Sequence, residues 1–310
     1  MTFQIATWSI HPLLLLMLIA ASLLYVRGWL HLRGKQPQLL GRSELTAFLL
    51  ANLLIGTAFL SPLAYWSDYL LSARALQQVL LTMLAPLLVW LACPVHVMTA
   101  GLPVAARRRA IRLLFTGPVR PVRLSVLGSP LLAVAFFVGG TLLWHDPKIV
   151  NAVMARDGLQ TLALWLLLMA ALLFWWHIVG RGPRRLAVYS SWAAAAYLLV
   201  AEIPNMLAGV SIAFHATPLY DYYWEVRMAG PALPLTVVED QMVAGAIIWV
   251  IGSIVYVFGI VLSVNHIFKR EGADAPIPRY TWDIDEKFIA PGLEHRLEQP
   301  DYVQVNWGED

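Results

Sequence analysis

Charged residues are scarce in this chain, and cysteine is almost absent. Of the 310 residues, 13% are charged and 59% are hydrophobic, whereas soluble domains usually carry about 25% charge. The mean hydropathy is +0.65, and a bilayer accommodates that much apolar surface where a soluble core does not. The single cysteine, Cys93, lies in an apolar run, which excludes a disulfide framework and a thiolate metal cluster.

Motifs of the common enzyme classes are also missing. The sequence has no phosphate-binding glycine loop, no HExxH and no Gly-x-Ser-x-Gly, so we expect no enzymatic activity. The Arg residues cluster between apolar stretches, which is typical of a topology signal and not of nucleic-acid binding. A membrane cytochrome is an alternative, because three His lie near the expected inner ends, but one haem needs two facing His at matched depth. These are His96, His177 and His266.

Seven apolar runs are long enough to cross the hydrocarbon core, which takes about 20 residues. They are Ile10–Val26, Leu45–Trp66, Ala75–Met98, Ser125–Trp144, Gly158–Val179, Leu186–Ala208 and Gln241–Val264. We therefore predict an all-α, polytopic membrane protein with seven transmembrane helices in residues 1–266. The first ten residues contain no Lys or Arg, so we expect the first run to be retained and not cleaved as a signal peptide.

The distribution of positive charge predicts the orientation. Eighteen of the 22 Lys and Arg residues follow the first, third, fifth and seventh runs, and four lie on the opposite side. Because cytoplasmic loops carry the excess of positive charge, we expect the N-terminus outside and the C-terminus inside. Residues 267–310 are polar and contain four prolines, and we interpret them as a cytoplasmic tail that is either disordered or used for docking.

Polar side chains gather at the predicted outer ends of the helices. Imidazole and thioether groups are suitable copper ligands, so His145 and His215, with a nearby Met, form a candidate metal site. No defined ligand spacing supports this site, and interfacial hydrogen bonding is the alternative role. Tyr220 follows the sixth run, and Asp240 and Gln241 open the seventh. We expect these three, with Trp249, to serve a partner or the outer face.

Glu202 is the most unusual residue of the sixth run, because a carboxylate inside a membrane is costly and faces the bundle interior or a water-filled cavity. Pro204 follows closely and frees a backbone carbonyl one turn earlier, which Asn205 is placed to satisfy. We expect Glu202 and Asn205 to form an intramembrane polar site, either for a proton, metal or partner, or as a structural knot. Arg74 and Arg227 are candidate partners of Glu202.

Gly245, Gly252 and Gly259 recur every seven residues on one face of the last run. Small residues allow close helix approach, so we predict that this face packs within the bundle or against another membrane subunit.

Several short motifs, in order and at matching spacing, resemble the CtaG-type cytochrome c oxidase assembly factors over about residues 42–266. The most specific is Glu239-Asp240-Gln241-Met242-Val243-Ala244-Gly245, with Trp249 following. The others are Leu71 to Gln78, Met83 to Pro86, Cys93-Pro94, Trp144 to Pro147, Leu173 to Trp176 and Thr217 to Tyr220 with Tyr223. The resemblance implies a seven-span protein of bacterial inner membranes that helps to mature haem–copper oxidases.

The chain departs from the family pattern where that pattern is rich in histidine. The family typically has Ser-Ala-His-x-x-Gln-His at the third span, and here the two His positions are Arg74 and Gln78. A second His-rich stretch on the fifth span is replaced by residues 160–164, which contain no His. The resemblance implies copper as a cofactor, and Arg74 and Gln78 weigh against it.

Three functions remain open from the sequence. The leading hypothesis is a non-catalytic assembly factor for a cytochrome c oxidase that holds membrane subunits of the terminal oxidase in the lipid bilayer. The second is a permanent accessory subunit of a respiratory oxidase. The third is a copper or proton pathway through Glu202, His145 and His215.

Overall fold

The computed structural model describes residues 11–34, 40–115, 128–156, 158–179, 191–230 and 233–261. Every regular element in these ranges is a helix, and they contain no strand. Six helices are long and apolar enough to cross a membrane, which confirms the all-helical, multi-pass fold. They are α1 (Pro12–Arg33), α2 (Arg42–Leu60), the third helix (Leu71–Leu91), α11 (Leu159–Val179), α12 (Ser191–Ala213) and the last helix (Val237–Val261). The predicted tail, 267–310, lies outside the described residues.

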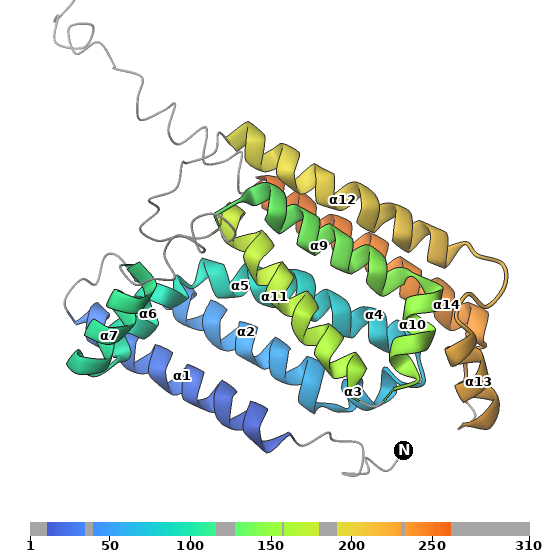
Figure 1. Cartoon of the computed structure of the whole chain (residues 1–310), viewed down its shortest axis with the longest axis horizontal. Coiled ribbons are helices and arrows are strands. Elements are labelled where there is room, and N and C mark those ends of the chain that lie inside the picture. The colour runs from blue at the N-terminus through green and yellow to red at the C-terminus, as the bar shows by residue number, and fades with distance from the viewer. Residues whose placement is uncertain are drawn as a thin grey trace, which may run out of the picture. The chain divides into compact units, whose positions relative to one another are not determined.

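The remaining predicted span corresponds to α9 (Pro130–His145), which is apolar but has only 16 residues. It begins where the Ser129 hydroxyl accepts a hydrogen bond from the Leu132 amide, a typical N-cap. The first residues of the predicted run, 125–127, fall outside the described ranges. Helix α9 packs along α11 and α12 (Figure 1). Six spans therefore meet the length criterion, and the seventh stays a prediction.

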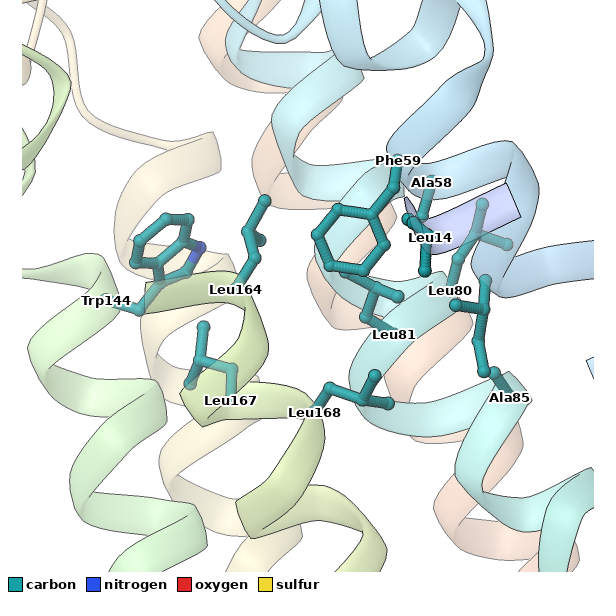
Figure 2. Packing of buried hydrophobic residues seen from close by; sticks show 11 residues of the cluster. Leu14, Ala58, Phe59, Leu80, Leu81, Ala85, Trp144, Leu164, Leu167 and Leu168 are labelled. Carbon is teal, nitrogen blue, oxygen red and sulfur yellow. The ribbon is translucent and has the colours of Figure 1, made fainter. Parts of the chain in front are cut away.

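The third helix lies at the centre of the bundle. Of its most apolar 18-residue window, 67% is buried, against 22–39% in the other five long helices. One buried cluster joins side chains of the third helix, α2 and α11 with Trp144 of α9 and Leu14 of α1 (Figure 2). Leu, Phe and Met side chains on the outer faces of the other helices are exposed. This pattern suits a helix bundle surrounded by lipid.

Two of the long helices contain a π-helical turn. In the third helix, α4 (Leu71–Val79) and α5 (Ala85–Leu91) are joined by η2 (Leu80–Leu84). In the last helix, α14 (Val237–Ala246) continues through η4 (Ile247–Ile251) to residue 261. Such turns are rare in proteins overall, and those that occur often lie at functional sites. Pro204 lies inside the neighbouring α12.

The glycine face of the last helix packs inside this chain. A Cβ added at Gly245 would lie 2.3 Å from the Ala213 nitrogen and 2.5 Å from the Gly209 oxygen, both in α12. A Cβ at Gly252 would lie 2.4 Å from the Asn205 side chain, and one at Gly259 would lie 3.3 Å from Leu198 and Trp175. The glycines therefore allow α12 to approach, and another subunit is not needed to explain them.

Short helices occupy the two ends of the bundle (Figure 1). One end carries α6 (Pro94–Gly101) and the Arg-rich α7 (Val104–Phe115). The other carries α3 (Pro62–Trp66), α10 (Pro147–Met154) and α13 (Asp221–Ala229). We call the second end the α13 end. It holds most of the residues that the sequence singled out.

Candidate functional site at the α13 end

Asp240 caps a helix other than its own. Its carboxylate accepts hydrogen bonds from the Leu71 amide at 2.7 Å, from the Ser72 amide at 3.3 Å and from the Ser72 hydroxyl. The N-cap residue of α4, Leu70, provides no side-chain cap. A carboxylate at this position satisfies unpaired amides and interacts favourably with the positive end of the helix dipole. Asp240 thereby joins the start of the last helix to the start of the third.

Gln241 holds the loop that leads from α12 to α13. Its Oε1 accepts from the Leu219 amide at 2.7 Å, and its Nε2 donates to the His215 and Thr217 carbonyls, both at 3.2 Å. Gln241 is 1% exposed, so these bonds are made away from water. One step earlier, Thr236 and Glu239 form a capping box that starts α14. Three consecutive residues therefore fix three segments: Glu239 the start of α14, Asp240 the start of α4, and Gln241 the loop between α12 and α13.

Two buried tyrosines complete the end of the bundle. The Tyr220 hydroxyl donates to the His145 carbonyl at 3.0 Å, and the Tyr223 hydroxyl donates to the Ser67 carbonyl at 2.8 Å. Burial raises the pKa of both phenols, and the nearby Arg74 opposes that shift. Both groups therefore stay protonated and remain donors. Tyr220, expected at an outer or partner face, is 1% exposed, so its side chain acts inside the protein.

Arg74 lies under this layer as a buried cation. It is 3% exposed, and its guanidinium carbon lies 4.1 Å from the centre of the Trp144 ring and 5.9 Å from that of Tyr220. Its Nη2 donates to the Trp144 carbonyl at 2.8 Å, while its Nε has no partner. In the described parts of the chain no carboxylate forms an ion pair with it. The stacking on Trp144 supplies part of the stabilisation that an ion pair would give.

We expect Arg74→Met to change the free energy of unfolding by less than about 1 kcal/mol, because the lost cation–π contact is offset by removal of a buried, unpaired charge. Arg74→Lys should destabilise the protein by about 2 kcal/mol, because an ammonium is more strongly hydrated and does not stack as a plane. Denaturant unfolding of the two purified variants in detergent measures both values. A loss above about 3 kcal/mol in Arg74→Met would contradict the view that the charge is dispensable for stability.

The two histidines of the candidate metal site have different surroundings. His145 Nδ1 lies 2.7 Å from the Thr141 carbonyl, and its Nε2 is buried without a partner. His215 is exposed, and its Nδ1 lies 2.9 Å from the Thr217 carbonyl. A carbonyl accepts a hydrogen bond, so Nδ1 carries the proton and Nε2 is the free ligand atom in each. Within the described ranges no group of three or more His, Cys, Asp or Glu could hold a metal ion. A copper site at His145 and His215 stays a prediction.

Glu202 and Asn205 lie away from the α13 end, where α12 meets the last helix. The Ser253 hydroxyl donates to Glu202 Oε1, and Asn205 Nδ2 donates to the Ile248 carbonyl at 3.2 Å. Asn205 therefore bonds to η4, and the expectation that it satisfies the carbonyl freed by Pro204 was wrong.

Two further predictions concern the partners of Glu202 and the role of Trp249. Neither Arg pairs with Glu202, because Arg74 bonds to Trp144 and Arg227 Nη2 donates to the Leu235 carbonyl. Trp249 lies in η4, where its backbone packs against Gly209, and not with Asp240 and Gln241. Its predicted role toward a partner stays a prediction.

Two residues of the cluster were missed by sequence reasoning. Trp144 forms the surface on which Arg74 stacks and accepts its hydrogen bond. Thr141 provides the carbonyl that faces His145. This contact uses the backbone carbonyl of position 141, so the residue type there gave no signal. Trp144 appeared in the sequence only as the first residue of a family motif, which gave no indication of its contact with Arg74.

The family model of the cytochrome c oxidase caa3 assembly factor (Caa3_CtaG) matches residues 23–270. The chain belongs to this family. Comparison with curated proteins and with solved structures gave no match. The matched range contains all of the α13 end, including Asp240 and Gln241. A role in cytochrome c oxidase assembly follows from membership.

Proposed function

We propose that this chain is a seven-span protein of the bacterial inner membrane that binds membrane subunits of a cytochrome c oxidase during assembly and catalyses no reaction itself. The match to the caa3 assembly-factor family over residues 23–270 carries the proposal. The α13 end adds a physical reason. Its polar groups bind one another and fix segments of the bundle, which suits a rigid surface for holding a partner.

The proposed topology places the α13 end outside and the Arg-rich end inside. Helix α9 counts as the fourth span, since it is apolar and packs along α11 and α12. The four exposed or partly exposed Arg of α7 lie at the end that becomes cytoplasmic, in agreement with the positive-inside rule. They are Arg107, Arg108, Arg109 and Arg112.

Deletion of the gene tests the proposal. We expect the membranes to contain less assembled terminal oxidase, and the purified enzyme should be compared with wild type for its copper-to-haem ratio. A lowered ratio would place the protein in maturation of the copper centre. An unchanged ratio with less enzyme would support a role in holding a subunit.

Two controls make the result specific. Wild-type gene and a Gly139→Ala variant, whose added Cβ would meet nothing within 4 Å, should both restore the oxidase. If amount and ratio are unchanged in the deletion strain, the assembly role is refuted. If the chain is present in stoichiometric amount in the purified, active oxidase, it is an accessory subunit instead.

A further inference from the structure

Glu202 and Asn205 each leave a buried oxygen atom without a hydrogen-bond partner. Glu202 Oε1 accepts from Ser253, but Oε2 has no partner. The Asn205 side chain lies next to this carboxyl, and its Nδ2 is used by the Ile248 carbonyl. That bond fixes which end of the amide is oxygen. Asn205 Oδ1 is buried and also lacks a partner. Each of these two adjacent side chains therefore has one buried oxygen atom without a hydrogen-bond partner in the described part of the chain.

The surroundings supply no cation for an ionised Glu202. In the described part of the chain no Lys, Arg or His forms an ion pair with it. Ser253 and Tyr256 of the last helix lie near Glu202, and Thr141 of α9 and Met83 of η2 lie on the Asn205 side of the pair. Of these groups only the Tyr256 phenol titrates, and it is neutral in its protonated form. A carboxylate with a single hydrogen bond inside a membrane costs several kcal/mol.

A small cavity lies beside Asn205. Its volume is about 10 Å³, which is about the size of one water molecule. Asn205 and Tyr256 line it and are 2% and 1% exposed. The rest of the wall is formed by Phe137, Val138, Thr141, Leu142, Ala201 and Pro204. Thr141, Asn205 and Tyr256 are the lining residues with polar side chains.

We propose that Glu202 is a proton-binding site, a neutral carboxylic acid at neutral pH that donates its proton from Oε2 to Asn205 Oδ1. One proton removes the buried charge and gives both unpartnered oxygens a hydrogen bond. The acid then connects Ser253 of the last helix with Asn205 of α12, which also lines the small cavity. This inference does not depend on the role in oxidase assembly.

Infrared difference spectroscopy on the full chain in detergent tests the proposal. At neutral pH the wild type should show the carbonyl-stretching band of a protonated carboxyl, shifted in D₂O, and Glu202→Gln should remove that band. Glu239→Gln, at an exposed capping-box carboxylate, should leave it unchanged. If Glu202→Gln instead removes carboxylate absorption and leaves no change in the protonated band, the proposal is wrong.

A second measurement separates protonation from structural damage. Glu202→Gln keeps the shape and supplies an N–H donor to Asn205 Oδ1, so its melting temperature should equal that of wild type at neutral pH. Asn205→Leu removes the acceptor. We therefore expect the carbonyl-stretching band of Glu202 in that variant to move to the frequency of a carboxylic acid that does not donate this hydrogen bond. An unmoved band in a folded Asn205→Leu protein would overturn the assigned acceptor.

Discussion

Replacement of Asp240 by Ala should destabilise the protein by about 3 kcal/mol, because hydrogen bonds to a charged group are each worth about 1.5–3 kcal/mol and buried amides would be left unpaired. Asp240 is 2% exposed and is the side chain that caps α4. Asp240→Asn keeps an acceptor but loses the charge, so about half of the loss should remain. Denaturant unfolding in detergent gives these values.

Glu239→Gln is the matched control for Asp240. Glu239 is the neighbouring carboxylate, and its side chain accepts from the Thr236 amide at an exposed position. Gln keeps an acceptor for this bond and loses only the charge, so the change should cost little stability. If Asp240→Ala costs no more than Glu239→Gln, the cross-helix cap does not hold α4 and the last helix together.

Gly245→Ala should cost about 3 kcal/mol or more, although Ala is a better helix former than Gly. The added Cβ would lie 2.3 Å and 2.5 Å from backbone atoms of Ala213 and Gly209. Backbone atoms do not move aside as the end of a flexible side chain does, so α12 and the last helix must separate. Thermal melting and denaturant unfolding should both show the loss.

Gly139→Ala provides the opposite result at a similar position. Gly139 lies inside α9, where an added Cβ meets nothing within 4 Å. There the lower backbone entropy of Ala should stabilise the protein by about 0.5–1 kcal/mol. A similar loss in both variants would show that helix propensity, and not close packing, governs the two glycines.

The sequence predicted the helices well because long apolar runs have few alternatives in a membrane. It also predicted the packing face of the last helix from the spacing of Gly245, Gly252 and Gly259. It did not predict how the polar groups at the α13 end are used. The partners of Asp240 lie 168 and 169 residues away, and no local pattern indicates such a pairing.

Sequence reasoning also assigned the wrong partner to three polar groups. A buried Arg and a buried Glu suggested an ion pair, but Arg74 stacks on Trp144 and Glu202 binds Ser253. A sequence gives no depth for a side chain, so it does not show which polar groups of different spans lie close enough to pair. Asn205 reaches a carbonyl in η4, a π-helical turn that apolar periodicity does not reveal.

The π-helical turns make the α13 end depend on the middle of the bundle. Ile248 of η4 bonds to Asn205 beside Pro204, and a Cβ at Gly252 would approach both Asn205 and Met83 of η2. A π-helical turn contains one more residue than an α-helical turn. Each residue of an α-helix corresponds to a rotation of about 100°, so the side chains on the two sides of the turn are rotated by about that angle relative to an unbroken α-helix. Deletion of a single residue within 247–251 would leave an uninterrupted apolar span and yet turn Asp240 and Gln241 away from their partners. The register of Asp240 and Gln241 is therefore set by a turn that begins six residues after Gln241.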